Sequence, residues 1–204
     1  DITDLCKDDE ENLLVVNCSN DYKDIVYPQS ADFTFYGGLY RGVNIISVPN
    51  THFDLDYYGG CGLTVTPAPD CQVGAVFDLK AYVTNPDENF TVLYSVCDRD
   101  GREVASAVRP ADDSAVKLYV GNVNLWGIDD PYLYTVTAVL QRRNEAYDEV
   151  SVRAGVLTFA CTPTEGFVLN GVQTPLRGVS RHQDQLYKGN ALSREDHYLD
   201  AALI

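Results

Sequence analysis

The chain has 204 residues, of which 45% are hydrophobic and 22% are charged, and this is the composition of a soluble globular protein. Thirty acidic residues against fifteen basic ones give a formal net charge of −15, which disfavours binding to the phosphate backbone of a nucleic acid. No apolar run reaches the ~18–20 residues that a membrane-spanning helix needs, so we expect neither a nucleic acid nor a membrane as a partner.

The first 49 residues form a block of extended chain that differs from the residues after it. NLLVVNCSN predicts a strand over residues 12–20, and YRGVNIISV predicts another over residues 40–48. So short a block buries too little apolar surface to fold alone, and we expect it to pack against other parts of the protein. Because the chain starts at Asp1 and contains no methionine, we also expect it to be a piece of a longer protein.

The middle of the chain, residues 50–160, shows the pattern of short antiparallel strands. Apolar and polar residues alternate over residues 73–83, which is the period of a half-buried strand. NPDEN (85–89) interrupts this alternation, and RDG (99–101) marks a hairpin turn. These signals predict an antiparallel β domain.

About seven or eight strands at this spacing predict a β-sandwich. The expected strands cover residues 52–58, 62–68, 73–83, 90–96, 102–108, 116–120, 131–140 and 150–159. Cys97, Trp126 and Cys161 do not have the spacing found in antibody domains. The expected likeness to immunoglobulin domains is therefore one of architecture only.

After Cys161 the pattern changes to a hairpin followed by one more strand. Asn170-Gly171 is a strong signal for a tight turn, and it predicts a hairpin over residues 167–176. RGVSRH predicts a short strand over residues 177–182.

A helix is expected at the end of the chain. Ser193 and Asp196 have the spacing of a capping box, in which Asp takes the place of the usual Glu. Leu199, Ala202 and Leu203 then form an apolar helical stripe. Strand, loop and helix together make a single βα unit, which is not stable alone and implies more chain.

The six cysteines show no CxxC motif and no Cys/His cluster, so we expect free thiols and no metal site. A Cys61–Cys71 bridge across a hairpin is the alternative. With no signal peptide visible, free thiols weakly favour the cytoplasm.

Three stretches together resemble glycoside hydrolase family 2, the family of β-galactosidases and β-glucuronidases. ADFTFYGGLYRGV (31–43) is similar to the end of its sugar-binding jelly roll, and LWGIDDPYLYTVTAVL (125–140) to the closing strands of its immunoglobulin-like sandwich. GFVLNGVQTPLRGVSRHQD (166–184) is similar to the start of its catalytic (β/α)8 barrel, with Ser180 where the family usually has Asn. The sequence of the segment SRHQD…GNALSREDH is more similar to that of β-galactosidases than to that of β-glucuronidases, which usually carry Lys before the His.

The resemblance implies a mainly β fold, an immunoglobulin-like sandwich with a flanking partial jelly roll and a truncated first βα unit of a (β/α)8 barrel. Three domains are expected. Residues 1–49 are the C-terminal part of the jelly roll, residues 50–160 form the sandwich, and residues 161–204 are the start of the catalytic barrel.

The resemblance further implies a retaining glycosidase that hydrolyses terminal β-D-galactosides or related oligosaccharides. Two glutamates, roughly 5–5.5 Å apart, act in such a mechanism as acid/base and nucleophile. In the family both stand on later barrel strands, and the ligands of the magnesium ion that the parent enzyme can bind also lie beyond residue 204. We therefore expect no catalytic residue and no metal ligand in these 204 residues, and no activity from them alone.

Two residues are expected to contact the sugar by resemblance. His182 matches the family histidine that donates a hydrogen bond in the glycone subsite, and Asp32 matches a jelly-roll acid that reaches the sugar hydroxyls. The alternatives are a surface histidine at a strand end and an exposed loop acid. Asp184 is a weaker substrate-binding candidate, and it could form an ion-pair lattice with Arg177 and Arg181 that positions the barrel mouth.

Other residues are expected to serve the structure. Arg41 is assigned to packing between domains. Trp126, with Tyr132 and Tyr134, could offer a sugar-stacking surface, but strand alternation favours an anchor in the sandwich core.

Two alternatives to the hydrolase interpretation remain at this point. A free-standing carbohydrate-binding module would need an exposed aromatic surface, and a structural module would act as a spacer or in oligomerisation. Uncovered apolar surfaces of cut domains also predict self-association.

Overall fold

The computed structural model describes residues 2–7, 9–25, 34–70 and 73–204. The chain divides into two compact units, one made of Asp1–Ile45 with Gly178–Ile204 and the other of Ile46–Arg177. We call the second the sandwich unit. Its extent differs from the expected domain of residues 50–160, because the hairpin around Asn170 belongs to it. The three-domain division stays a prediction.

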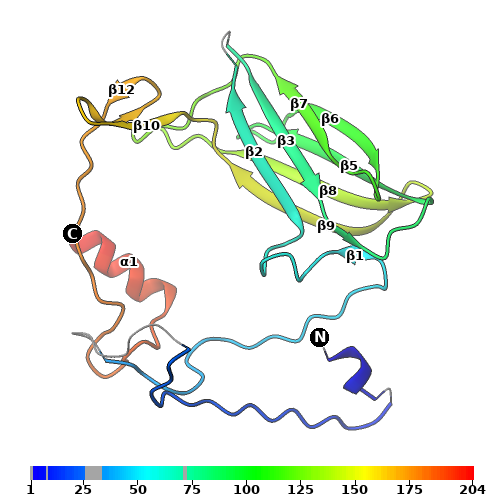
Figure 1. Cartoon of the computed structure of the whole chain (residues 1–204), viewed down its shortest axis with the longest axis vertical. Helices are drawn as coiled ribbons and strands as arrows, with labels where there is room; N and C mark the ends of the chain where they lie inside the picture. Colours follow the sequence, from blue (N-terminus) through cyan, green and yellow to red (C-terminus); the bar gives the residue numbers. More distant parts are fainter. Residues whose placement is uncertain (1, 8, 26–33, 71–72) are drawn as a thin grey trace. The chain divides into compact units, whose positions relative to one another are not determined.

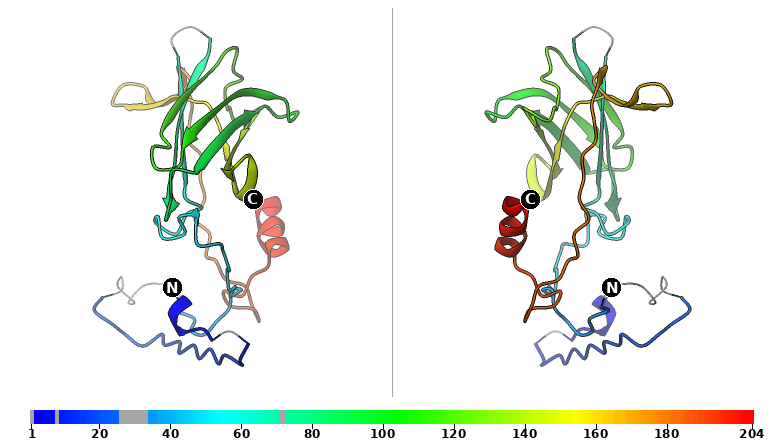
Figure 2. Two further views of the ribbon diagram at one scale, coloured as in Figure 1. Left: turned by 90° about the vertical axis from the view of Figure 1, so that its right-hand side faces the viewer. Right: turned by 90° about the vertical axis from the view of Figure 1, so that its left-hand side faces the viewer.

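Two antiparallel sheets form the sandwich unit and face each other (Figures 1 and 2). One has the order β2-β3-β7 and the other β6-β5-β8-β9. The strands are β2 (Leu63–Pro69), β3 (Ala75–Ala81), β5 (Phe90–Cys97), β6 (Glu103–Pro110), β7 (Val116–Val120), β8 (Tyr134–Arg142) and β9 (Glu145–Ala154). Three strands facing four in these orders give the arrangement of an immunoglobulin-like domain, and the mainly β sandwich predicted from the sequence is confirmed.

The alternation of apolar residues explains the core. Burial follows a strict period of two along β5 and β8, so that every second side chain points between the sheets. Phe77 and Leu79 of β3 share this core with Val92 and Val136, and all four are fully buried. Removal of this apolar surface from water is the main force that holds the sheets together.

A buried polar network ties β3 to β5 inside this core. The backbone N–H of Ala81 donates to the Tyr94 hydroxyl at 2.9 Å, and that hydroxyl donates to the Ser114 carbonyl at 3.0 Å. The Ser114 hydroxyl donates to the Ala81 carbonyl at 2.5 Å. Burial raises the pKa of Tyr94, so this hydroxyl stays protonated and can donate.

Short strands lie outside the two sheets. β1 (His52–Phe53) pairs with β4 (Val83–Thr84), so the strand expected over residues 52–58 is limited to its first part. A second group is β10 (Phe159–Thr162), β11 (Gly166–Leu169) and β12 (Val172–Gln173) (Figure 1).

The predicted hairpin turn between β11 and β12 is confirmed. Asn170 and Gly171 have φ angles of 49° and 78°, the left-handed pair that a two-residue turn of this kind requires. The Asn170 side chain also accepts from the Thr158 N–H at 2.9 Å and donates to the Trp126 carbonyl at 2.9 Å. These bonds fix the hairpin to the end of the sandwich.

The other compact unit contains little regular structure among its described residues. It holds the 3₁₀ helix η1 (Thr3–Leu5) and the helix α1 (Arg194–Leu203), whose predicted capping box is present. The strands predicted over residues 12–20, 40–48 and 177–182 are wrong, since all three segments are irregular. A strand requires hydrogen bonds to a neighbour, and no described segment pairs with these three.

The described cysteines carry free thiols, as the sequence predicts. Cys71 lies outside the described residues, so the alternative Cys61–Cys71 bridge does too. Within the part of the chain that the structure describes, no helix is long and apolar enough to cross a membrane.

Candidate functional site

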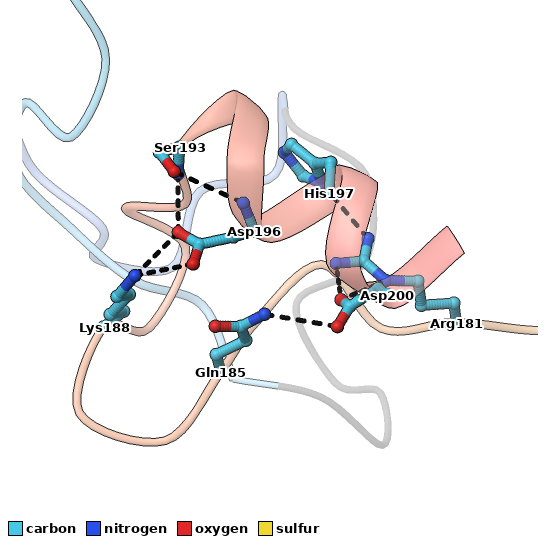
Figure 3. Close-up of polar contacts among 7 residues, drawn as sticks. All are labelled: Arg181, Gln185, Lys188, Ser193, Asp196, His197 and Asp200. Atoms are coloured by element: carbon cyan, nitrogen blue, oxygen red, sulfur yellow. Dashed lines mark hydrogen bonds and ion pairs between the residues drawn. The ribbon is translucent and has the colours of Figure 1, made fainter. Parts of the chain in front are cut away.

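The segment RGVSRH is tied to α1 by one arginine. Arg181 Nε donates to Asp200 Oδ2 at 2.6 Å, and Arg181 Nη2 donates to the same oxygen (Figure 3). Gln185 Nε2 donates to the other carboxylate oxygen at 3.3 Å. About a quarter of each charged side chain of the pair is exposed, so solvent screens this ion pair only in part.

The charges around α1 keep both of its inward carboxyls ionised. The Arg181 guanidinium holds the pKa of the Asp200 carboxyl below its usual range. Lys188 Nζ lies 2.6 Å and 2.8 Å from the two oxygens of Asp196 and lowers the pKa of that carboxyl. Asp196 also accepts from the Ser193 N–H at 2.8 Å, so it closes the helix start and fixes the preceding loop (Figure 3).

The loop between Arg181 and α1 is folded on itself and contacts the N-terminal block. The Gly189 N–H donates to the Gln185 carbonyl at 2.9 Å. The Tyr36 hydroxyl donates to Asp184 Oδ2 at 3.4 Å, and the Tyr36 ring covers Gly189 so closely that a Cβ there would lie 2.7 Å from Cε1. Glycine is thus required at this point of the loop.

The three residues expected to contact substrate have different surroundings. His182 is exposed and directly follows the arginine that anchors the segment to α1. Asp184 is half-buried and accepts from Tyr36. Asp32 lies outside the described residues. Their roles toward a sugar stay predictions.

The ion-pair lattice expected for Arg177, Arg181 and Asp184 stays a prediction, since Arg177 belongs to the sandwich unit and the other two residues do not. Within its own unit Arg181 pairs with Asp200, because α1 places that carboxylate beside the guanidinium. Arg177 and Arg41 are exposed, and the Arg41 guanidinium lies 5.7 Å from the centre of the Tyr40 ring. The structural roles assigned to these arginines stay predictions.

Trp126 lies at the junction of the sandwich and the β10–β12 hairpin, half-buried and outside the central core. Its backbone N–H donates to the Val156 carbonyl at 2.8 Å, and its side chain covers Gly155. Tyr132 and Tyr134 are buried, so neither offers a ring face to a sugar.

Sequence reasoning missed Asp200, Gln185 and Tyr36. Asp200 could have been found, since Asp196 and Asp200 are four residues apart and share a face of the predicted helix. The contact of Tyr36 with a loop about 150 residues later has no local signal.

The described residues contain no group of three His, Cys, Asp or Glu side chains placed to hold a metal ion. The ligands of the magnesium ion implied by resemblance are expected outside these 204 residues, so that ion stays a prediction and no step is assigned to it. What the arrangement can do is hold an exposed histidine at a fixed position beside a charged, hydrogen-bonded loop.

Comparison with known proteins gives consistent matches. Residues 64–156 match the family model described as glycosyl hydrolases family 2. A β-glucuronidase of Bacteroides fragilis is 32% identical over the whole chain, which spans 31% of that relative. The β-galactosidase BoGH2A of Bacteroides ovatus is 34% identical over 90% of the chain, which spans 22% of it.

Solved structures agree with these matches. The crystal structure described as an FMN-binding β-glucuronidase from Facaelibacterium prausnitzii L2-6 is 62% identical, with a TM-score of 0.88, over 91% of this chain and 29% of that one. A β-glucuronidase of Bacteroides uniformis is 29% identical with a TM-score of 0.77 over 89% of this chain and 23% of that one. The chain thus spans less than a third of the length of these relatives.

Proposed function

Because this chain belongs to glycosyl hydrolases family 2, we propose that it forms the sandwich and the first part of the catalytic barrel of a larger, retaining β-glycosidase. The observation that carries the proposal is the Arg181–Asp200 pair, which joins the motif segment to α1. That contact is what a βα unit at the start of a (β/α)8 barrel needs, because the strand end and the following helix must be fixed to each other.

Residues 177–182 are irregular in this chain, and we propose that they form the first barrel strand when the rest of the barrel supplies hydrogen-bonding neighbours. His182 then lies at the end of that strand, where (β/α)8 enzymes bind substrate. It donates a hydrogen bond to a sugar hydroxyl that strengthens as charge develops in the transition state. Asp32 accepts from neighbouring hydroxyls, and Asp184 shapes the loop through its bond with Tyr36. The sandwich unit acts as a rigid spacer between the sugar-binding and catalytic parts.

A terminal β-D-glucuronide is the substrate we favour. The supporting observation is the 62% identity to a protein described as a β-glucuronidase. A β-D-galactoside is the second candidate. It is supported by the sequence SRHQD…GNALSREDH and by the 34% identity to a β-galactosidase. The catalytic glutamates are assigned to chain outside these 204 residues, which are proposed to be inactive alone. A cytoplasmic location is proposed from the sequence only.

The flavin in the description of the 62% relative is not transferred to this chain, which spans 29% of that protein. A flavin phosphate would need an open anion site, such as a helix N-terminus. In the described part of the chain the one α-helix begins with its own capping box and with Glu195 and Asp196, which repel a phosphate.

The test is an assay of the larger enzyme with the p-nitrophenyl β-D-glucuronide and β-D-galactoside in parallel. We expect turnover of the glucuronide with kcat/KM at least about 100-fold above that of the galactoside, the discrimination that a lost or unpaired buried polar contact provides. The 204-residue chain should turn over neither. Preference for the galactoside would establish the second candidate, and cleavage of neither by the larger enzyme would refute the glycosidase proposal.

A further inference from the structure

The loop between β1 and β2 carries two adjacent tyrosines at the end of the sandwich unit (Figure 1). The Tyr57 ring stacks on the Tyr82 ring, with centroids 3.8 Å apart and 16° between the planes. Tyr58 meets Tyr57 edge-on, with centroids 5.0 Å apart. We call these three side chains the tyrosine platform.

Backbone hydrogen bonds hold this loop in one conformation. The Asp54 N–H donates to the Tyr82 carbonyl at 2.8 Å, and the Tyr82 N–H donates to the Gly62 carbonyl at 2.7 Å. Gly62 has a φ angle of 71°, and a Cβ on it would lie 2.7 Å from the Asp54 nitrogen, so glycine is required there. A loop fixed in this way loses little conformational entropy when it binds a ligand.

The outermost ring of the platform is left to solvent. Tyr58 is 94% exposed and has a φ angle of 50°, a region that residues with a side chain rarely adopt. Tyr82 is covered by Tyr57 and has the Lys80 ammonium 4.7 Å from its centre. The Tyr57 and Tyr82 hydroxyls are hydrogen-bonded at 3.1 Å, and this bond raises the pKa of Tyr57, which keeps that phenol neutral.

From this geometry we propose that the tyrosine platform binds a neutral pyranose ring of an oligosaccharide, which stacks its C–H face on Tyr58. An aromatic ring with a polar hydroxyl suits a ligand that has one apolar face and a polar rim. This inference goes beyond the proposed function, which concerns turnover at the barrel.

The charged residues of the same loop favour one kind of sugar in this proposal. Asp54 and Asp56 stand in the same loop, and Lys80 contacts the platform, so two carboxylates accompany one ammonium. Carboxylates accept strong hydrogen bonds from sugar hydroxyls but repel a uronate. A neutral hexose is therefore favoured over the glucuronide proposed as the substrate.

Calorimetric titration of the 204-residue chain tests the proposal, with β-1,4-linked glucose and galactose tetrasaccharides as probes and glucuronic acid as the anionic comparison. We expect saturable binding of at least one tetrasaccharide and none of glucuronic acid. Tyr58→Ala should weaken binding about tenfold or more, which corresponds to ~1.4 kcal/mol. Tyr187→Ala is the matched control, since Tyr187 is 96% exposed with a φ angle of 70° but lies in the other unit.

Several results would overturn the proposal: no saturable binding of either tetrasaccharide, equal losses in both variants, or a loss in Tyr187→Ala alone. Both variants should keep the native circular dichroism spectrum, so that a loss of affinity reports the missing ring and not misfolding. If Tyr58→Ala instead abolishes self-association of the chain, the surface is a contact between copies and the sugar proposal is wrong. None of these results bears on turnover by the larger enzyme.

Discussion

Replacing Tyr94 with Phe removes a single hydroxyl from the middle of the sandwich unit. Tyr94 is fully buried, and its hydroxyl both accepts from the Ala81 N–H and donates to the Ser114 carbonyl. The ring itself stays, so packing against the neighbouring strands is unchanged. The variant therefore isolates the buried polar network from the apolar core.

The expected loss comes from the two backbone groups that become unpaired. Each buried polar group without a partner costs ~1–3 kcal/mol, and a carbonyl costs less than an N–H because it has a second lone pair. We expect the free energy of unfolding to fall by about 2–4 kcal/mol. For a unit of this size that corresponds to a fall in Tm of roughly 10 °C.

Urea unfolding followed by the fluorescence of Trp126, the one tryptophan in the sequence, measures this loss. Tyr147→Phe is the control, because Tyr147 is 44% exposed and its free energy should change by less than ~0.5 kcal/mol. If Tyr94→Phe changes the free energy of unfolding no more than the control does, the network does not stabilise the sandwich and the reasoning fails.

Three further predictions concern other parts of the chain. Because Arg181 lowers the pKa of Asp200 in the folded chain, the pair should stabilise α1 fully above pH ~4, the unfolded pKa of an aspartate, and lose this effect as pH falls through the lowered folded pKa. An acid titration that follows the amide chemical shifts of α1 should show this transition, and Asp200→Asn should lack it. Gly62→Ala should lower the free energy of unfolding by ~1–3 kcal/mol, since a Cβ would meet the Asp54 backbone at a positive φ; a neutral result in urea unfolding would contradict that. The exposed apolar residues 13–16 predict concentration-dependent self-association, and a monomer at all concentrations in sedimentation velocity would argue against it.

The sequence was sufficient where the signal is local. Alternation over β3 and β5, the Asn170-Gly171 turn and the capping box at Ser193 each depend on neighbouring residues, and the structure contains all of them. Residues 12–20 have equally strong strand propensity but no strand, since a strand exists only when another segment supplies hydrogen bonds.

The candidate site was predicted only in part for the same reason. The RGVSRH segment was identified from its resemblance, but Asp200 as the partner of Arg181 depends on how the chain returns from the loop to α1. The platform was missed because HFDLDYY alternates like a strand, although Gly59-Gly60 directly after it is a turn signal. The aromatic residues considered for sugar stacking from the sequence were Trp126, Tyr132 and Tyr134. They lie in or beside the core.

His182 is the residue that we propose this chain contributes to the sugar site of a family 2 glycosidase. Kinetics of His182→Ala in the larger enzyme test this contribution most directly, with Gln183→Ala, also exposed, as the neighbouring control. Loss of a hydrogen bond made in the transition state predicts a fall in kcat/KM of about 100-fold for His182→Ala and little change for the control. Equal kcat/KM values for His182→Ala and the unaltered enzyme would contradict the claim.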